Sequence, residues 1–284
     1  MKTLYITDLD GTLLDDTGHV SARSAAIITE LSHRGVAISV ATARTPATVE
    51  PLLAETYTTA DLVVMTGATL WSRVHHCFEE MQLIPEDDVR LMFEVFAEVG
   101  ATPFCYVRRD GSHLDVYHAG ERLNAAEQKF VDERSNLRLK TFHFREACPV
   151  DACDRVVLFF GMGPKDKIVA AAERLREQSD CYISYYKDTY TPDLWLLEIF
   201  APGVSKAAGI ERLRRKISAD RMVAFGDNLN DLPMLQMADV AVAVGNALPE
   251  VKAMADVVIG TNNEDAVARF IAEDSAQTEG NILP

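Results

Sequence analysis

Apolar and polar positions in the first 70 residues follow two alternating patterns. Continuous apolar runs, typical of buried strands, are separated by segments with the spacing of an amphipathic helix. Gly35 ends the first helical segment, and Thr45 with Pro46 begins the second. The expected order is strand KTLYIT (2–7), helix 21–35, strand VAISVAT (36–42), helix 45–55 and strand ADLVVMTGA (60–68). Such alternation favours a parallel sheet with crossover helices.

The pattern changes between about residue 70 and residue 192, where paired short strands replace the long buried ones. The expected strands are 101–107, 112–120, 154–161 and 181–187, and the expected helices are 85–100, 124–135 and 164–178. This order is typical of an α+β unit with antiparallel strands. We therefore expect an insert at 81–189 within the first domain.

After Trp195 the first pattern returns. The expected helices are 204–217, 231–238 and 249–255, and the expected strands are 221–227 and 239–245. The core is therefore expected to be α/β and discontinuous in sequence, formed by residues 1–80 and 190–284. Residues 275–284 are expected to form a loose tail.

Composition and charge exclude several classes of protein. The 284 residues, 48% hydrophobic and 25% charged, have the composition of a globular protein. No apolar run approaches the roughly 18 to 20 residues that span a membrane, and the N-terminus lacks a signal peptide, so we expect a cytoplasmic protein without membrane partners. The net charge of −15 argues against nucleic-acid binding. The choice between monomer and dimer stays open.

The cysteines and histidines show no metal-binding pattern. There are five cysteines, without a CxxC pair, and seven histidines, without an HExxH arrangement. Cys148 and Cys153 can be neighbours on a loop, but their spacing matches no common zinc site. We therefore expect reduced, partly buried thiols.

Unusual polar residues follow the strands of the predicted core. Ligands of open parallel sheets bind at the carboxyl ends of the strands, so these residues are expected to converge in one crevice. They are Asp8 and Asp10 after the first strand, Thr42 and Arg44 after the second, Asp227, Asn228, Asn230 and Asp231 after strand 221–227, and Lys206 at the start of a helix. Each alone can be a turn, a cap or a surface residue. Their common position at strand ends favours a functional site.

Phosphoryl transfer is the chemistry that suits this set. Clustered carboxylates require a divalent cation, and hard oxygen ligands suit Mg²⁺. One carboxylate can attack phosphorus and form an acyl phosphate, and a second, two residues further on, can act as general acid and then base. A hydroxyl and an ammonium group can hold the equatorial phosphate oxygens. Gly11 lets the backbone turn sharply, so that free amides can also face the phosphate.

Four motifs in this order resemble those of the haloacid dehalogenase (HAD) superfamily of phosphatases. They are DLDGTLL (8–14), ATAR (41–44), GVSK (203–206) and GDNLNDLPML (226–235), of which the first and fourth are the most specific. The insert resembles the α/β cap of the Cof-type, class IIB members, which are mostly sugar-phosphate phosphatases. The resemblance implies a Rossmann-like, HAD-like parallel-sheet core with an inserted α+β cap that governs substrate access.

The resemblance also implies a role for each matching residue. Asp8 matches the nucleophile, and Asp10 matches the general acid/base, which lends its backbone carbonyl to the metal. Asp231 is expected to support the metal shell or to orient Lys206. The implied catalytic residues are Asp8, Asp10, Thr42 and Lys206, the phosphate- or substrate-binding residues are Leu9, Thr42, Ala43, Arg44, Lys206 and Asn230, and the Mg²⁺ ligands are Asp8, Asp10, Asp227 and Asp231.

Two positions depart from the family pattern, and the insert is harder to interpret. Ala43 replaces a common glycine, which a helical or extended backbone tolerates. Thr66 stands where relatives often carry asparagine. In the insert we select polar and aromatic candidates for contact with the leaving group, namely Arg108, Arg109, His113, His118, Tyr185, Tyr186 and Lys187.

The function expected from the sequence is that of a Mg²⁺-dependent phosphatase. It would hydrolyse a small phosphorylated metabolite, with a sugar phosphate as first candidate, through an aspartyl phosphate on Asp8. Two alternatives stay open. A phosphomutase or phosphotransferase would pass the phosphoryl group from Asp8 to a sugar hydroxyl, and a regulatory protein would bind a phosphorylated metabolite without useful turnover.

Overall fold

The computed structural model describes residues 1–188 and 191–280. The chain divides into two compact units, one formed by residues 1–79 with 205–284 and the other by residues 80–204. We call them the core and the inserted unit. The core is discontinuous in sequence because the inserted unit interrupts it once.

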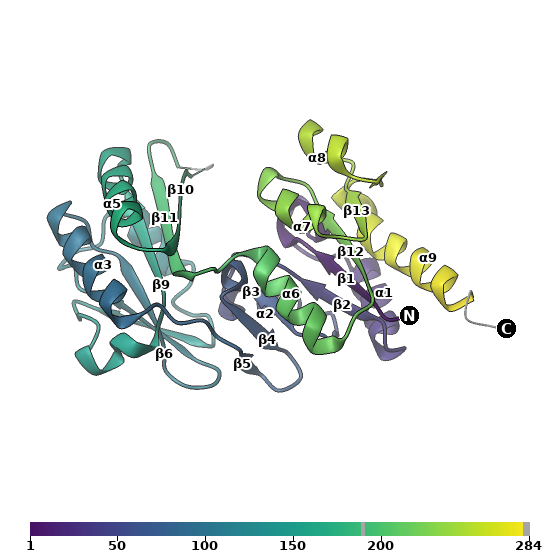
Figure 1. The fold of residues 1–284 in the computed structure, drawn as a ribbon, viewed down its shortest axis with the longest axis horizontal. Helices are drawn as coiled ribbons and strands as arrows, with labels where there is room; N and C mark the ends of the chain where they lie inside the picture. The colour runs from purple at the N-terminus through teal and green to yellow at the C-terminus, as the bar shows by residue number, and fades with distance from the viewer. Residues whose placement is uncertain (189–190, 281–284) are drawn as a thin grey trace. The chain divides into compact units, whose positions relative to one another are not determined.

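A five-stranded parallel sheet forms the centre of the core (Figure 1). Two adjacent inner strands, Thr3–Thr7 and Arg221–Gly226, are buried along most or all of their length. This burial explains why their sequences are continuous apolar runs and do not alternate. In order across the sheet, the strands are β14 (Val257–Val258), β13 (Val240–Ala243), β12 (Arg221–Gly226), β1 (Thr3–Thr7) and β2 (Ala37–Val40).

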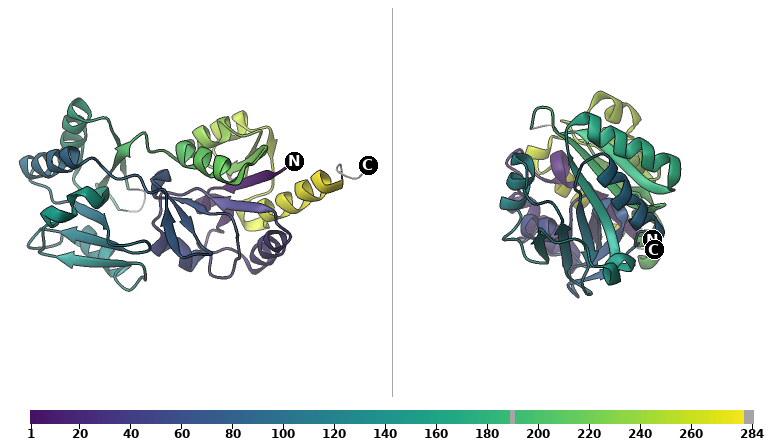
Figure 2. Two further views of the ribbon diagram at one scale, coloured as in Figure 1. Left: turned by 60° about the horizontal axis from the view of Figure 1, so that its bottom comes forward. Right: turned by 90° about the vertical axis from the view of Figure 1, so that its left-hand side faces the viewer.

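Helices cover both faces of the core sheet. Figure 2 (left) shows the green helices on one side of its strands and the purple α1 and yellow α9 on the other. The helices of the core are α1 (Ala22–His33), α2 (Pro46–Leu52), α6 (Lys206–Ile217), α7 (Leu232–Gln236), α8 (Pro249–Met254) and α9 (Ala266–Gly280). Within residues 1–188 and 191–280, no helix is both long enough and apolar enough to cross a membrane.

The third strand differs from the sequence prediction. It is shorter than 60–68 and belongs to a separate antiparallel sheet of β3 (Leu62–Val64), β4 (Thr69–Ser72) and β5 (Cys77–Glu79). An isolated parallel bridge between Ala41 and Val63 connects it to the chain that follows β2. Met65 and Thr66 have positive φ angles of 52° and 56°, so the extended backbone ends there, in the short helix η2 (Met65–Gly67).

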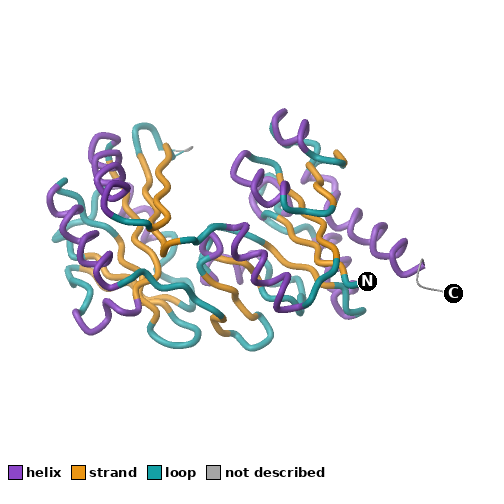
Figure 3. The backbone as a smooth tube through the Cα atoms, viewed as in Figure 1, coloured by secondary structure: helices purple, strands orange, loops and turns teal. Residues whose placement is uncertain are grey.

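The inserted unit contains a six-stranded mixed sheet. The strands pair antiparallel except for β7 and β8, which are parallel. In order, they are β10 (Cys181–Lys187), β11 (Trp195–Pro202), β9 (Val156–Gly163), β6 (Phe104–Arg108), β7 (Leu114–His118) and β8 (Lys140–Phe144). Its helices are α3 (Glu86–Glu98), α4 (Ala125–Asp132), α5 (Lys165–Gln178) and the 3₁₀ helix η3 (Val150–Arg155), and Figure 3 shows the two long ones, α3 and α5, beside each other.

The second boundary of the insert differs from the expected position at residue 190. The core resumes at residue 205, because β11 pairs with β10 and β9 in the sheet of the inserted unit. The sequence pattern predicts neither β11 nor, at one edge of the same sheet, β8. Its residues, KTFHF, are half polar, and their pairing with β7 is set by packing between distant segments.

The C-terminal segment is helical further than the sequence predicts. Helix α9 continues through residues 275–280 of the expected tail, and residues 281–284 lie outside the described part of the chain. Ala268, Ile271 and Ser275 are all nearly inaccessible, and their spacing puts them on one side of the helix. That side packs against α1 and β1, so tertiary contacts stabilise a helix whose last turns are polar in sequence.

Candidate active site

The polar residues predicted at the strand ends do meet in the core. Asp8 follows β1, and its backbone N–H donates to the carbonyl oxygen of Phe225 in β12 at 3.1 Å. Strand β12 ends at Gly226, so Asp227 emerges beside Asp8 at the same edge of the sheet. The parallel pairing of β1 with β12 therefore brings together two motifs more than 200 residues apart in sequence.

Lys206 connects two buried carboxylates at this edge. Its Nζ donates to Oδ1 of Asp8 at 2.6 Å and to Oδ1 of Asp231 at 3.0 Å. Lys206 is the first residue of α6, which begins after the N-cap Ser205, whose hydroxyl accepts from the N–H of Ala208. The start of α6 is pressed against Gly67, where an added Cβ would lie 2.1 Å from the carbonyl oxygen of Ser205. Glycine at 67 is thus required for the placement of the lysine.

Asp231 has both carboxylate oxygens engaged. Oδ1 accepts from Lys206, and Oδ2 accepts from the backbone N–H groups of Asp227 and Asn228 at 3.1 and 3.2 Å. The residue is fully buried. Asp231 therefore links Lys206 to the loop that carries Asp227.

Gly11 forms the turn that brings the DxD segment against Asp227. Its φ of +75° is in the left-handed region, and an added Cβ would lie 2.6 Å from Oδ2 of Asp227. The next residue, Thr12, donates its hydroxyl to Oδ1 of Asp227 at 2.9 Å. A side chain at position 11 would therefore strain the backbone and displace a carboxylate of the site.

Thr42 and Arg44 follow β2 on the other side of β1. Thr42 is buried, and its hydroxyl accepts from the backbone N–H of Arg44 at 3.2 Å. Arg44 makes a bidentate ion pair with the carboxylate of Asp10, with Nε–Oδ2 and Nη2–Oδ1 distances of 2.9 and 2.6 Å. Asp10 is exposed, so this pair lies at the rim of the cluster and Asp8 lies inside it.

The two departures from the family pattern have different consequences. Ala43 has no positive φ, so alanine is tolerated in place of glycine, as expected. Thr66 has a φ of 56°, which is unfavourable for a β-branched residue and more favourable for asparagine. Its backbone N–H donates to the carbonyl oxygen of Thr42, while its own hydroxyl is buried without a hydrogen-bond partner in the described structure.

Burial and neighbouring charges shift the pKa values of the central pair. Burial raises the pKa of Asp8 to about 7, the Lys206 ammonium opposes this shift, and the carboxylates of Asp231 and Asp10 add to it. For Lys206, burial favours the neutral form, but the carboxylates of Asp8 and Asp231 outweigh it and raise its pKa above the usual value. The ammonium is thus held charged, and negative charge in the cluster is in excess.

The carboxylates could hold a divalent metal ion. Asp8, Asp227 and Asp231 each offer one oxygen, and these three oxygens lie within 4.8 Å of one another. With Asp10 included, the carboxylates exceed the cations Lys206 and Arg44 by two formal charges. Asp8 and Asp227 each keep an oxygen outside the hydrogen bonds found in the described structure, whereas Asp231 has none left. Hard oxygen donors with this charge excess fit a divalent cation, and Asp8 and Asp227 are the better placed ligands.

Two predicted residues are less closely connected to this cluster. Asn230 is exposed on the short helix η4 (Leu229–Asp231) and, among the contacts of the described residues, does not hydrogen-bond to the buried carboxylates. The side chain of Leu9 is fully buried in the core, so only its backbone can face a ligand.

Sequence reasoning missed Asn246, which supports the DxD turn. Its Nδ2 donates to the carbonyl oxygen of Gly11 at 2.7 Å, and its Oδ1 accepts from the N–H of Asn262 at 3.0 Å. Asn246 follows β13, so the rule that selects polar residues after core strands would have found it.

The candidates in the inserted unit are mostly engaged within that unit. Arg109 pairs with Asp115, and the ring nitrogen Nε2 of His113 lies 2.9 Å from the hydroxyl of Thr141. Tyr186 donates to Glu198 at 3.2 Å. Of the other candidates, His118 is buried, Arg108 and Tyr185 are half-buried, and Lys187 is exposed. These contacts do not single out one of them for recognition of a substrate.

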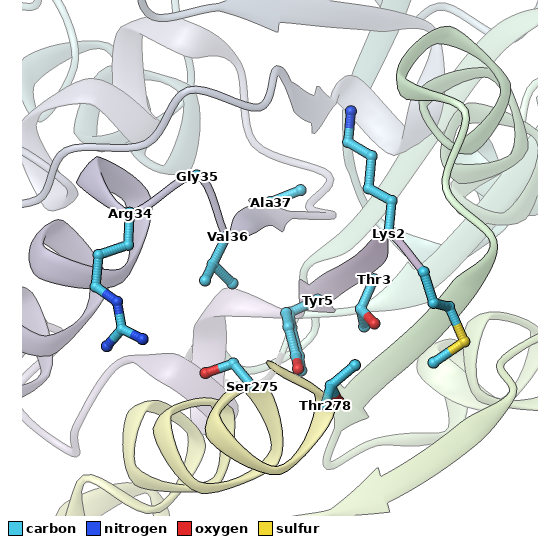
Figure 4. A pocket seen from close by; sticks show the side chains of 10 residues that line it. Lys2, Thr3, Tyr5, Arg34, Gly35, Val36, Ala37, Ser275 and Thr278 are labelled. Atoms are coloured by element: carbon cyan, nitrogen blue, oxygen red, sulfur yellow. The ribbon is translucent and has the colours of Figure 1, made fainter. Parts of the chain in front are cut away.

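A cavity of about 380 Å³ lies at the opposite edge of the core sheet, beside the amino ends of β1 and β2. Figure 4 shows Lys2 and Arg34 on either side of it, with Tyr5 and Ser275 between them. Its lining includes none of the predicted site residues. The carboxylate cluster at the carboxyl ends of the strands is therefore the candidate active site.

Comparisons with known proteins agree with this assignment. The family model described as haloacid dehalogenase-like hydrolase matches residues 5–271. Over 272 residues the chain is 26% identical to the 5-amino-6-(5-phospho-D-ribitylamino)uracil phosphatase YcsE of Bacillus subtilis (strain 168), with 94% of each protein covered.

Solved structures of similar fold cover nearly the whole chain. A haloacid dehalogenase-like hydrolase from Bacteroides thetaiotaomicron has a TM-score of 0.77 at 22% identity, covering 96% of this chain and 99% of that one. The HAD subclass IIB sugar phosphatase BT4131 has a TM-score of 0.68 at 21% identity, covering 97% and 99%. At these identities the likeness establishes the fold.

Proposed function

Because this chain belongs to the haloacid dehalogenase-like hydrolases and is a phosphoric monoester hydrolase, we propose that it hydrolyses small phosphorylated metabolites through an aspartyl phosphate on Asp8. The observation that carries the proposal is the contact of Lys206 with both Asp8 and Asp231. It holds a buried carboxylate in a fixed position for attack on phosphorus.

In this mechanism one oxygen of the Asp8 carboxylate attacks phosphorus, and its other oxygen is left for a metal ion. The Lys206 ammonium and the Thr42 hydroxyl stabilise the charge that spreads over the phosphoryl oxygens. Asp10 protonates the leaving oxygen and later takes a proton from the water that attacks the aspartyl phosphate. The ion pair with Arg44 keeps Asp10 at the rim of the site until a phosphate competes for the guanidinium.

We propose Mg²⁺ as the cofactor, with Asp8 and Asp227 as side-chain ligands and the Asp10 carbonyl oxygen as a further ligand. A bound Mg²⁺ would neutralise the excess negative charge and reduce repulsion between the carboxylates and a phosphate. The hydrogen bond from Thr12 and the turn at Gly11 orient Asp227 for this role.

The substrate class we propose is a sugar phosphate or a phosphate ester of similar size. The proposal is supported by the names of two similar proteins, a phosphatase of a phosphoribityl compound and a HAD subclass IIB sugar phosphatase. We further propose that the inserted unit governs substrate access.

A phosphate-release assay tests the proposal. The enzyme is supplied with a panel of phosphorylated sugars, nucleotides and small acids, with Mg²⁺ and with EDTA. We expect release from a narrow set of sugar phosphates and its loss in EDTA, because the carboxylates then repel the substrate. Release that is unchanged by EDTA would rule out the metal, and release from nucleotides alone would rule out the substrate class.

The nucleophile is tested by Asp8→Asn, which keeps the size of the side chain. We expect kcat/KM to fall by roughly 10⁴-fold or more, because an amide cannot form the acyl phosphate. A circular-dichroism spectrum matching that of the wild type controls for folding. Turnover within tenfold of the wild type would exclude Asp8 as nucleophile.

The fate of the phosphoryl group distinguishes the alternatives left open by the sequence. A phosphotransferase would move labelled phosphate between two sugar hydroxyls without releasing it. A regulatory protein would bind a phosphorylated sugar in the presence of Mg²⁺ and release no phosphate. Neither is favoured by a particular contact in the core.

A further inference from the structure

Three of the five cysteines gather in the inserted unit. Cys105 lies in β6, Cys148 in the loop after β8, and Cys153 in η3. The sulfur atoms of Cys148 and Cys153 both approach the carbonyl oxygen of Pro149, at 3.7 and 3.8 Å. The thiols of Cys105 and Cys153 are also among the groups that act on the pKa of Cys148. Cys148 is therefore the central member of this group, which we call the thiol cluster.

Tertiary packing, and not spacing in the sequence, forms the thiol cluster. Helix η3 packs against β6, and this contact brings Cys105 to a loop more than 40 residues further along the chain. Pro149 is the N-cap residue of η3 and holds the backbone between Cys148 and the helix in an extended conformation. The loop therefore presents its sulfur to a fixed strand.

The members of the thiol cluster differ in accessibility and in protonation. Cys148 is half-buried, whereas Cys105 and Cys153 are buried. The hydrogen bond with Cys105 lowers the pKa of Cys148, burial opposes this, and Cys153 and the Arg155 guanidinium lower it further. Burial raises the pKa of both Cys105 and Cys153. Of the three thiols, Cys148 is therefore the one whose deprotonation is favoured, and deprotonation of its neighbours is disfavoured.

The geometry favours chemistry between pairs of sulfurs over a metal site. A metal site needs at least three ligand atoms close to one another. Among the described residues, the group with all its ligand atoms within 4.8 Å of one another is the aspartate cluster of the core. The three sulfurs do not meet this condition together. Cys148 interacts with each neighbour separately, and two-electron oxidation to a disulfide joins two sulfurs at a time.

We propose that Cys148 is a reversible oxidation site at which a hydroperoxide produces a disulfide between Cys148 and Cys105. The Cys148 thiolate attacks the peroxide, the O–O bond breaks, and a sulfenic acid forms with release of water or an alcohol. The sulfur of Cys105 then attacks the sulfenic sulfur, the S–O bond breaks, and the thiol proton leaves with the hydroxide as water. Two thiols are oxidised for each peroxide reduced, and a dithiol reverses the reaction.

The remaining two cysteines provide matched controls within the same chain. Cys77 in β5 of the core is half-buried like Cys148, but burial and nearby carboxylates raise its pKa. Cys181 in β10 is buried, and burial raises its pKa to about 11. Neither has another thiol among the groups that shift its pKa, so neither is expected to form an intramolecular disulfide.

Mass spectrometry of the full-length protein tests the proposal. The reduced protein is treated with hydrogen peroxide at neutral pH, alkylated and digested. We expect a disulfide-linked peptide joining Cys105 and Cys148, its loss after treatment with dithiothreitol, and alkylation of reduced Cys148 several-fold faster than of Cys77. Absence of a disulfide at Cys148, or pairing of Cys148 with Cys153, would overturn the proposal.

Variants sharpen this test. In Cys105→Ser, a dimedone adduct should accumulate at Cys148, because the sulfenic acid then lacks its partner. Cys153→Ser and Cys181→Ser should leave the disulfide between Cys105 and Cys148 intact, and these variants keep the test informative if Cys105→Ser fails to fold. Loss of the disulfide in Cys153→Ser with wild-type folding would contradict the assigned pair.

Discussion

The core and the inserted unit each bury a lysine, and the surroundings of the two lysines are opposite. Lys206 in the core contacts the carboxylates of Asp8 and Asp231. Lys140 in the inserted unit lies over the rings of Phe130 and Phe142, at 6.0 and 5.2 Å from the ring centres, and has no ion pair to a carboxylate among the described residues. Their exposed fractions are similar, 8% and 5%.

The same degree of burial therefore produces opposite pKa shifts. Burial and the nearby Arg134 lower the pKa of Lys140 to about 7. Burial also disfavours the ammonium of Lys206, but its two carboxylates raise the pKa above the usual value. Partners decide the charge state of a buried lysine, and burial alone does not.

The difference between the two lysines also indicates which of them has a functional role. A buried ion pair contributes little to stability compared with apolar residues of the same volume, so the charged cluster of the core needs a functional explanation. The proposed phosphoryl transfer provides one, because it would use both the carboxylates and the ammonium. Lys140 serves no comparable network and can be treated as part of the packing of the inserted unit.

Among the variants that test the comparison of the two lysines, the largest effect is expected from Lys206→Met, which removes the ammonium from the core cluster. We expect kcat/KM to fall by roughly 10²–10³-fold, because a preorganised positive charge near the phosphoryl oxygens is lost. The free energy of unfolding of the core should fall by about 3–5 kcal/mol, since the buried carboxylates of Asp8 and Asp231 lose the ammonium that they share. Steady-state kinetics and urea unfolding measure the two effects. A free energy of unfolding equal to that of the wild type would contradict the expected difference between the two lysines.

The same substitution in the inserted unit, Lys140→Met, should have the opposite effect on stability. At pH 7 we expect the free energy of unfolding of this unit to rise by up to about 4 kcal/mol, because an ammonium whose pKa falls from 10.5 to about 7 on burial is removed. Turnover should remain near that of the wild type. Urea unfolding at pH 7 measures the change, and a destabilised Lys140→Met would show that the two lysines are alike.

The pH dependence of stability provides a second test at Lys140. Its pKa is about 7 in the folded state against 10.5 for an ordinary lysine, so the unfolded chain binds more protons between these values. Stability contributed by this residue therefore increases as the pH rises from about 7 to 10.5. Relative to Lys140→Met, the wild type should gain stability over this window. A pH-independent difference between the two proteins would contradict the assigned pKa.

The smallest effect is expected from Asn246→Ala at the edge of the core cluster. The variant removes a neutral hydrogen bond to the Gly11 carbonyl, worth about 1 kcal/mol, so kcat/KM should fall severalfold. The activation curve for Mg²⁺ should shift to higher concentration, because the turn that orients Asp227 loosens. An effect as large as that of Lys206→Met would mean that charge does not dominate the site.

The sequence was most informative where local pattern and topology act together. Asp8, Thr42 and Asp227 could be predicted as neighbours because each follows a strand of one parallel sheet. Lys206 could be assigned only with its motif, because by itself a lysine at the start of a helix resembles a surface residue. The family resemblance drawn from the four motifs is confirmed by the family model.

Features that depend on contacts between distant segments could not be predicted from the sequence. Residues 195–202 were counted with the core and not predicted as a strand, because their apolar run does not reveal that they join the sheet of the inserted unit as β11. The last turns of α9 are polar and become helical through packing against α1 and β1. The proximity of Cys105 to Cys148 depends on the packing of η3 against β6.

The most direct test of the account is to identify the residue that carries the phosphoryl group. The wild-type enzyme is mixed with the best substrate of the panel and Mg²⁺, quenched during turnover and reduced with borohydride, which converts an aspartyl phosphate to homoserine. The account predicts homoserine at position 8 and none in Asp8→Asn. Homoserine at position 10, or no reduced aspartate during measured turnover, would contradict the account.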